Sequence, residues 1–523
     1  MSNHIIHKQE VILNVESIDN AFNYQNTVSK LFANGLTTAI EETLNEIDTP
    51  GTITRIEKLN LDLGEINAAD FTNGFKSKLI QQLKASLSSL HSENTSDVSV
   101  TKQAQSVREG FIFFIEKGIL PWYIEAKNMA ALEAVIFKEW TEKDWLLLIS
   151  WLRENAKNTP SITERIALQC SQELIRQIVA AATYKNIEEN QWQLLLNDLK
   201  TIYSKLNVLG SSAITSAKPI NYIIEILELL FEQDKSFTLD ELIAVQLHKL
   251  FLKANDTIIL NQFSVLVNSM HTKPVTTIIE NIAVLYEKQV TLLHISPKEL
   301  LRTDKNWLTD LSSLKPGLKI NESESFTDNK KYPQAKEEKA AGKTSDKIKK
   351  NKDDIIEDAL FVDNCGIILL HPFLLSYFES LQLIEKKKFV SDEAQKRAIL
   401  LLYYLSTGLT EIAEFNLVLQ KVLCGFDMEE TLPSEIILSQ QEIDESKELL
   451  QTVINYWPPV KNTSVEGLQQ TFLQRKGKLI TTDTGWQLTV EQKTVDVLLN
   501  KLPWGFSTVK LPWMTGFLNV EWC

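Results

Sequence analysis

The chain has 523 residues, of which 44% are apolar and 23% are charged, as in an ordinary globular protein. Its formal net charge of −14 argues against a general nucleic-acid-binding protein, which concentrates positive charge on one face. Its four cysteines show no CxxC spacing, so we expect neither a disulfide framework nor a zinc site, and a reducing cytoplasm fits best. The length predicts about three domains.

No segment carries the signature of a signal peptide or a membrane span. The N-terminal sequence MSNHIIHKQEVILNV lacks an apolar core followed by a small-residue cleavage site. The two most apolar stretches, CGIILLHPFLLSYF and AILLLYYLSTGL, end before the ~18 residues that cross a bilayer. We therefore expect a cytoplasmic protein with no membrane partner.

The pattern of residues 1–92 predicts a small α/β module. Apolar residues alternate with polar ones at 11–15, which predicts one strand, and the stretch ITRIEKLNLDLGEI at 53–66, with alternation at 59–63, predicts a second. Apolar residues at near-helical spacing predict a helix over 17–47, and a second helix over 68–90. The Ser/Thr-rich stretch that follows the second helix is typical of a hinge or linker.

The rest of the chain predicts two helical regions around a linker. Helical runs with polar or Pro breaks fill 107–312; an α-solenoid is the alternative, but no fixed repeat period favours it over an irregular helical domain. In 315–355 apolar residues almost vanish, which predicts a disordered charged linker. Residues 356–523 predict a mainly helical C-terminal domain that ends in short strands. The fold class is therefore mainly α, with small α/β elements at both termini.

Motifs for catalysis or for cofactor and metal binding were tested, and none holds. Ala340–Ser345 reads AAGKTS, but a glutamate stands where a phosphate-binding loop needs its first glycine. His4 and His7 lack a nearby cluster of further ligands and are interpreted as surface residues. Cys365 and His371 lie in a run of Ile, Leu and Phe, where burial is more common than nucleophilic catalysis. We expect no catalytic residue, no cofactor and no metal.

The tripeptide Leu-Pro-Trp occurs three times, twice in the last 22 residues, and Val-Glu-Trp follows it near the chain end. In one interpretation each Trp caps a core and its indole N–H reaches a backbone carbonyl. In the other, the tryptophans face a partner, because Trp is enriched at interface hot spots. The candidate structural or interaction residues are Leu120, Pro121, Trp122, His371, Pro372, Leu502, Pro503, Trp504, Leu511, Pro512, Trp513 and Trp522.

The chain end has a strand-like pattern. Between Pro503 and Pro512 the alternation predicts a short edge strand, with each Pro near a boundary that needs no donor. A second strand should follow, with Leu518, Val520 and Trp522 on one face. We expect this tail to pack within the C-terminal domain, and also to meet the N-terminal module.

Several rare sequence words occur in one order along the chain. They are RIEKLNLDLGEI at 55–66, GILPWY at 118–123 and, within 356–523, DNCGIILLHPFLLSYF, RAILLLYYLSTG, EFNLVLQKVLCGF, LQQTFLQRKGKL and LPWGFSTVKLPWMTGFLNVEW. Together they resemble the tape measure proteins of extracellular contractile injection systems, the phage-tail-like particles of bacteria. Cys365 stands where the resemblance predicts Ala. The resemblance covers most of 1–66 and 356–523 and brings no catalytic residues.

The resemblance implies a structural assembly component that helps to set tube and sheath length. Its implied partners are the tube, the spike or baseplate, and the cap, with assembly in the cytoplasm and retention in the particle. One continuous helix of this length would extend ~780 Å at ~1.5 Å per residue, but helix breakers predict a far shorter folded chain. The alternatives are an adaptor or chaperone that caps the tube or loads cargo without measuring it, and an enzyme whose site the sequence does not reveal.

Overall fold

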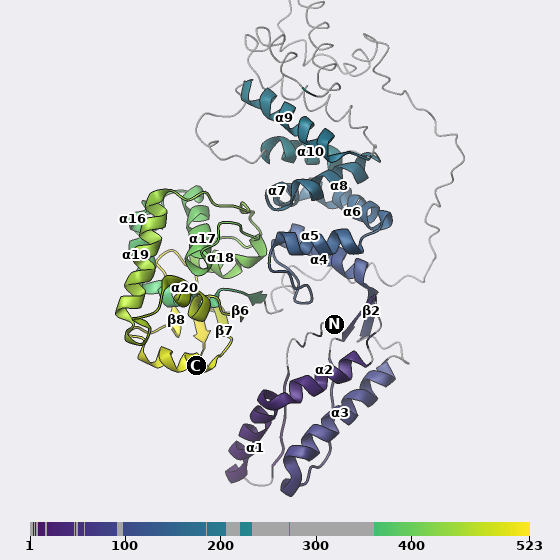
Figure 1. Cartoon of the computed structure of the whole chain (residues 1–523), viewed down its shortest axis with the longest axis vertical. Helices are drawn as coiled ribbons and strands as arrows, with labels where there is room; N and C mark the ends of the chain where they lie inside the picture. Colours follow the sequence, from purple (N-terminus) through teal and green to yellow (C-terminus); the bar gives the residue numbers. More distant parts are fainter. Residues whose placement is uncertain are drawn as a thin grey trace, which may run out of the picture. The chain divides into compact units, whose positions relative to one another are not determined.

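The computed structural model describes most of residues 4–232 and all of 360–522, together with His271. The gaps within the first range fall at 5, 7–8, 16–17, 47, 49–50, 57, 91–97, 185 and 206–219. The predicted linker at 315–355 and the end of the predicted helical region, 233–312 apart from His271, lie outside the described residues. The described part is mainly helical with small sheets, which confirms the predicted fold class (Figure 1).

The chain divides into two compact units. The first comprises Met1–Gly110, Trp122–Glu125 and Val135–Thr141. The second comprises Phe111–Pro121, Ala126–Ala134 and Glu142–Cys523.

The first unit is built on three helical stretches and a two-stranded sheet. Its elements are α1 (Ile18–Leu31), η1 (Phe32–Leu36), α2 (Thr37–Asn45), β1 (Thr52–Ile56), η2 (Ala68–Asp70), α3 (Phe71–Leu90), β2 (Val98–Lys102) and the start of α4 (Gln103–Lys117). The helices bury one apolar core between them, as their amphipathic spacing requires. The core side chains are Val28, Leu36, Ile40, Phe75, Leu79, Leu83 and Leu87.

Of the two strands predicted in the first unit, the one at 11–15 is wrong, and the one predicted within 53–66 is present only at its start, as β1 (Thr52–Ile56), and not at the alternating residues 59–63. The segments 11–15 and 59–63 join no sheet, although Leu59, Leu61 and Leu63 pack against the helical core. At 59–63 the period of two reflects an extended chain that packs every second side chain on the helices without a backbone ladder, whereas at 11–15 Leu13 packs on the core while Val11 and Val15 are exposed. The sheet instead pairs β1 antiparallel with β2, and β2 lies in the stretch that was expected to be a linker.

The second unit begins with a series of packed helices. They are the end of α4, α5 (Met129–Glu139, partly in the first unit), α6 (Glu142–Asn155), η3 (Ala156–Asn158), α7 (Pro160–Gln169), α8 (Gln172–Thr183), α9 (Glu189–Lys205) and α10 (Ile220–Glu232). Local sequence sets their ends: Pro160 opens α7, and Ser171 caps α8 by accepting a hydrogen bond from the Leu174 amide. Helix α10 packs against α6, α7 and α8.

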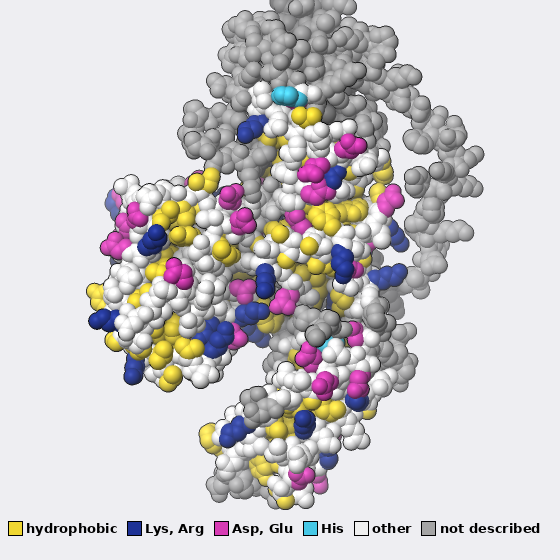
Figure 2. All heavy atoms as spheres, viewed as in Figure 1, with side chains coloured by type: hydrophobic (Ala, Val, Ile, Leu, Met, Phe, Trp, Pro, Cys, Tyr) yellow, Lys and Arg dark blue, Asp and Glu magenta, His cyan; other side chains and the backbone are white. Residues whose placement is uncertain are grey.

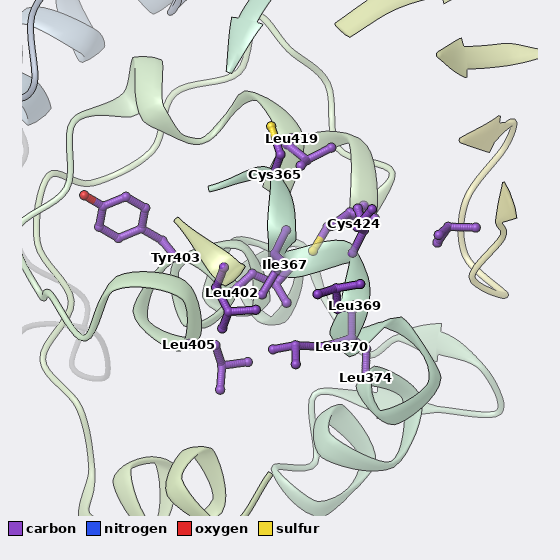
Figure 3. Packing of buried hydrophobic residues seen from close by; sticks show 14 of the residues in the cluster. Cys365, Ile367, Leu369, Leu370, Leu374, Leu402, Tyr403, Leu405, Leu419 and Cys424 are labelled. Atoms are coloured by element: carbon purple, nitrogen blue, oxygen red, sulfur yellow. The ribbon is translucent and has the colours of Figure 1, made fainter. Parts of the chain in front are cut away.

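The C-terminal fold of the second unit combines helices with a five-stranded sheet and a separate two-stranded sheet. Its elements are β3 (Leu360–Val362), η4 (Cys365–Leu370), α16 (His371–Ser380), β4 (Ile384–Glu385), β5 (Lys388–Phe389), α17 (Asp392–Thr407), η5 (Glu414–Asn416), α18 (Val418–Cys424), α19 (Gln440–Tyr456), η6 (Pro458–Val460), α20 (Val465–Leu468), η7 (Gln469–Leu473), β6 (Gly477–Thr482), β7 (Gly485–Val490), η8 (Thr494–Lys501), β8 (Thr508–Val509) and β9 (Phe517–Glu521). Figure 3 shows side chains of η4, α17 and α18 gathered in its core. Gly366 allows the closest approach, because an added Cβ would lie 1.8 Å from the Phe472 carbonyl oxygen.

The chain end forms the last two strands of this sheet, in the order β3-β6-β7-β9-β8. Strand β8 lies at the edge and pairs antiparallel with β9, which pairs parallel with β7. Leu518, Val520 and Trp522 are buried together in the C-terminal core. These observations confirm the predicted edge strand, the predicted second strand and the packing of the tail within the C-terminal fold. The expected contact with the N-terminal module stays a prediction.

Candidate interaction segments and their buried polar contacts

The two Leu-Pro-Trp segments of the tail are anchored through their indole rings. Trp504 Nε1 donates a hydrogen bond to the Leu369 carbonyl at 3.0 Å, and Trp513 Nε1 donates to the Leu423 carbonyl at 2.9 Å. The Trp513 ring also lies 5.2 Å from the Phe389 ring. Both tryptophans are half-buried, so each ring covers the apolar core while its polar N–H finds an acceptor.

The Leu and Pro residues of these segments divide by burial. Leu511 is buried and Leu502 packs against the core from a half-buried position. Pro503 and Pro512 are exposed. Pro372, in the first turn of α16, is exposed as well, where its missing N–H costs no helical hydrogen bond.

Cys365 and His371 are bonded to backbone carbonyls and not to each other. The Cys365 thiol lies 3.4 Å from the Val362 carbonyl, and burial raises its pKa well above 9.0, which disfavours the thiolate that a nucleophile needs. His371 Nδ1 lies 2.9 Å from the Ile368 carbonyl oxygen, and burial lowers its pKa. An added Cβ at Gly477 would lie 2.5 Å from Cys365 Sγ, so this glycine makes room for the sulfur.

Near the end of the tail, Trp522 contacts a buried ion pair. We call Arg475, Asp496 and Trp522 the Arg475 cluster. Arg475 Nη2 and Asp496 Oδ1 lie 2.5 Å apart, and both residues are buried. Trp522 Nε1 donates to the other carboxylate oxygen at 3.1 Å, and the Lys493 amide donates to it at 2.8 Å. Arg475 Nε also donates to the Thr471 carbonyl. The segment LQRKG, through Arg475, and the segment VEW near the chain end, through Trp522, are therefore connected by their hydrogen bonds to Asp496.

A second polar group lies in the first unit, where two further sequence words meet. The guanidinium of Arg55 lies 3.7 Å from the centre of the Tyr123 ring, a cation–π contact. Arg55 also pairs with Glu109 at 3.2 Å and donates to Ser106 Oγ at 2.7 Å. Burial raises the pKa of Tyr123. Trp122 lies edge-on to Tyr123, with the ring centres 5.8 Å apart.

The remaining residues of this third Leu-Pro-Trp, Leu120 and Pro121, are half-buried. Just before them, Gly118 adopts a φ of +75° at the end of α4. An added Cβ there would lie 2.5 Å from Glu414 Oε1, so the position needs glycine both for its backbone and for its space. The word GILPWY thus begins against a carboxylate of the C-terminal fold.

That carboxylate belongs to a fully buried group, which we call the Arg165 cluster: Arg165, Glu414 and Lys421. Arg165 Nε lies 3.0 Å from Glu414 Oε2, and Lys421 Nζ lies 2.7 Å from Glu414 Oε1. Burial lowers the pKa of Lys421, against the opposing effect of Glu414. A buried Arg, Glu and Lys are rare without such pairing.

Sequence reasoning missed Arg55, Arg165, Glu414, Lys421, Arg475 and Asp496. Four of them stand inside the words that carry the resemblance, since Arg55 opens RIEKL, Glu414 and Lys421 lie in EFNLVLQKVLCGF, and Arg475 lies in LQRKG. For Glu414 and Lys421, the available signal was a charged residue inside a mainly apolar word, whereas the words around Arg55 and Arg475 carry several other charged residues and gave no such signal.

The described residues offer little for small-molecule or metal chemistry. Within them, no group of His, Cys, Asp and Glu side chains could hold a metal ion. A cavity of about 350 Å³ lies beside α1 and the start of α3, with Asn23, Tyr24 and Asp70 in its lining. Acidic and basic side chains are interspersed on the face drawn in Figure 2. None of the helices that the structure describes is long and apolar enough to cross a membrane.

Comparison with known proteins gives one match. A family model described as contractile injection system tape measure protein matches residues 3–522. The match includes the middle of the chain, which the sequence words did not cover. No curated protein and no solved structure matches the chain.

Proposed function

The chain belongs to the contractile injection system tape measure proteins, structural and non-enzymatic components that set tube and sheath length, and we propose that it acts as linked folded units rather than as one continuous helix. The evidence for the function is the family match, which covers nearly the whole chain. The evidence for the proposed mechanism is the folded state of the described residues.

The helices that the structure describes are short relative to a tube. The longest of them, α3, has 20 residues, which corresponds to ~30 Å at ~1.5 Å per residue. Helix ends are fixed locally, as where Ser439 and Glu442 form a capping box at the start of α19. Such ends oppose fusion into a longer helix, which supports length control through the way the folded parts are joined.

The C-terminal fold is the part that we propose to anchor the chain in the particle. The family associates with tube and baseplate components. The indoles of Trp504 and Trp513 hold the tail on this fold, which leaves Pro503 and Pro512 as exposed, rigid surface. We propose that the spike and the cap are further partners, and that assembly takes place in the cytoplasm with retention in the particle.

An adaptor or chaperone that caps the tube or loads cargo is the second candidate. It is favoured by the closed packing of the described C-terminal fold, whose last strands pair within its own sheet and whose Trp522 is buried in its own core. A compact body suits docking as well as it suits measuring.

Particle length tests the proposal. Loss of the chain should give particles of abnormal or variable length in electron micrographs, and an unchanged length distribution would contradict a measuring role. A graded series of deletions within 315–355 should shorten the tube in proportion to the residues removed, whereas an adaptor would leave length unchanged or abolish assembly. Replacement of the same residues by Gly and Ser at equal number is the matched control, and it should keep the original length.

A further inference from the structure

Within the second unit, the helices α4 to α10 meet the C-terminal fold at a contact that we call the joint. The joint is centred on Arg165 of α7, which lies 3.0 Å from Glu414 and also donates to the Glu429 carbonyl at 2.6 Å. Gln169, one turn further along α7, donates to the Leu432 carbonyl at 2.7 Å and accepts from the Glu414 amide at 2.9 Å. Every one of these contacts is a hydrogen bond or an ion pair.

The edges of the joint are polar as well. Asn416 donates to the Lys127 carbonyl at 2.9 Å, and Thr431 donates to Glu164 at 3.0 Å. Lys117 pairs with Glu429 at 3.0 Å. Side chains of both α4 and α7 therefore contact the loop that follows α18 in the C-terminal fold.

The joint also contains apolar contacts. Among the described residues, the buried core of the C-terminal fold consists of residues from 362 onward, and Ile119 is the helical-side residue that packs against it. Phe114 adds an edge-on contact with Phe415, with the ring centres 5.5 Å apart. Because the free energy of burial scales with apolar area, exposing these side chains costs less than exposing the whole core of either side.

Each side of the joint has some polar contacts that lie wholly within that side. On the helical side, Arg165 Nη1 donates to the carbonyls of Ile115 and Glu116, which are end-of-helix carbonyls of α4. On the other side, Lys421 stays paired with Glu414 and also donates to the carbonyls of Met428 and Glu430. The Lys421–Glu414 pair is neutral by itself, and Arg165 remains as a cation at a helix C-terminus, where it is favoured.

We propose that the joint opens as a unit, so that the helical part and the C-terminal fold separate while both stay folded. Opening exchanges hydrogen bonds across the joint for hydrogen bonds to water, at a cost below that of unfolding either side. As far as it concerns tube length, the inference rests on the proposed function, since an opening joint lets a folded chain lengthen without unfolding.

Hydrogen–deuterium exchange on the full-length free chain tests the joint. Peptides that contain Gly118 and Glu414 report on the joint, and peptides around Ile178 and Leu401 report on the two interiors. In the unaltered chain, the joint peptides should exchange at least about tenfold faster than both interiors. Equal rates in all four peptides would overturn the proposal.

Two variants sharpen the test. Gln169→Ala removes contacts that only cross the joint, and it should speed exchange of the joint peptides about tenfold while both interiors change less than about twofold. Arg165→Ala should give the same pattern with a larger effect. In this variant, exchange in the interior of the helical part shows whether the C-terminal end of α4 stays folded without the hydrogen bonds from Arg165. Arg153→Ala is the matched control, because Arg153 donates to the Ala182 carbonyl within the helical part.

The outcomes separate the joint from the proposed function. If Gln169→Ala speeds the interiors as much as the joint, the two parts unfold together and the joint does not open as a unit. If exchange follows the expected pattern but particle length is independent of the chain, the joint stands and the measuring role fails. If particle length depends on the chain while Gln169→Ala leaves the joint peptides at their original rate, only the joint proposal fails.

Discussion

Arg165 and Arg475 are both fully buried and both paired with a carboxylate, yet they do different work in the fold. Arg475 pairs with Asp496, 21 residues further along the chain, inside one fold. Arg165 pairs with Glu414, 249 residues further along, between two parts of the second unit. The same chemistry therefore closes a chain end in one place and joins two folded parts in the other.

The two clusters differ in what remains when the pair is lost. In the Arg475 cluster, Asp496 also accepts from Trp522 Nε1, so the carboxylate holds the last strand as well as the arginine. In the Arg165 cluster, Glu414 keeps Lys421 and Arg165 keeps two helix carbonyls. Loss of the first pair should therefore unfold structure, and loss of the second should separate structures that stay folded.

Deletion of residues 502–523 should have the largest effect. It removes β8 and β9 and takes Leu511, Met514 and Trp522 out of the C-terminal core. Each such side chain contributes several kcal/mol, so the melting transition of the C-terminal fold should be lost or strongly lowered in calorimetry of the purified chain. Deletion of Cys523 alone is the control. An unchanged transition with impaired particle assembly would make the tail a partner-facing surface instead.

Asp496→Ala should have the next largest effect. It leaves Arg475 buried without its carboxylate and Trp522 Nε1 without its acceptor. Loss of one partner from a buried pair costs about 3–5 kcal/mol, which urea unfolding of the full chain measures. Asp444→Ala on the exposed face of α19 is the matched control, and it should change stability by less than about 0.5 kcal/mol. A small effect of Asp496→Ala would show that the cluster does not hold the chain end.

Sequence patterns predicted what depends on near neighbours in the chain. Helical spacing gave the helices of the described residues, and alternation between Pro503 and Pro512 gave the edge strand β8. The same alternation failed at 11–15, where Val11 and Val15 are exposed, and at 59–63, where an extended segment that packs on helices has the period of a strand. Periodicity reports which side chains are buried and does not report which backbone groups are paired.

Such patterns could not predict the two ion clusters. Glu414 and Arg165 are separated by most of the second unit, and no local spacing connects them. Arg, Lys and Glu are usually exposed, so a sequence pattern assigns them to the surface. The Leu-Pro-Trp words were found because Trp and Pro are rare, and one of the two interpretations, an indole N–H on a backbone carbonyl, describes Trp504 and Trp513.

Trp513→Phe should have a moderate effect on stability. It keeps an aromatic ring near Phe378 and Phe389 but removes the N–H that donates to the Leu423 carbonyl. A carbonyl left without its donor at a half-buried site costs about 1–2 kcal/mol in thermal or urea unfolding. Trp486→Phe, in the sheet, is the matched control for ring size. Equal losses in both variants would assign the effect to ring volume and not to the hydrogen bond.

Glu442 gives the smallest effect and the one that depends on pH. Its carboxylate accepts from Arg397 Nε at 2.6 Å and from the Ser439 amide at 2.7 Å at the start of α19. Burial by itself raises the pKa of this carboxyl, but the hydrogen bonds from Arg397 and Ser439 outweigh burial, and the net pKa is lowered from 4.5.

Because the pKa of Glu442 is lower in the folded chain than in the unfolded chain, its contribution to stability is fully present above the unfolded value and is lost as pH falls through the folded one. Glu442→Gln should therefore cost about 1 kcal/mol at neutral pH, where Arg397 loses a charged partner. The difference between the variant and the original chain should shrink as the pH falls below 4.5 and through the lower pKa of Glu442 in the folded chain, since both then carry a neutral side chain at this position. Urea unfolding at a series of pH values measures this difference. Glu448→Gln, on the exposed side of the same helix, is the control, and it should show little pH dependence. A pH-independent cost for Glu442→Gln would assign the effect to the capping geometry alone, with no contribution from the charge.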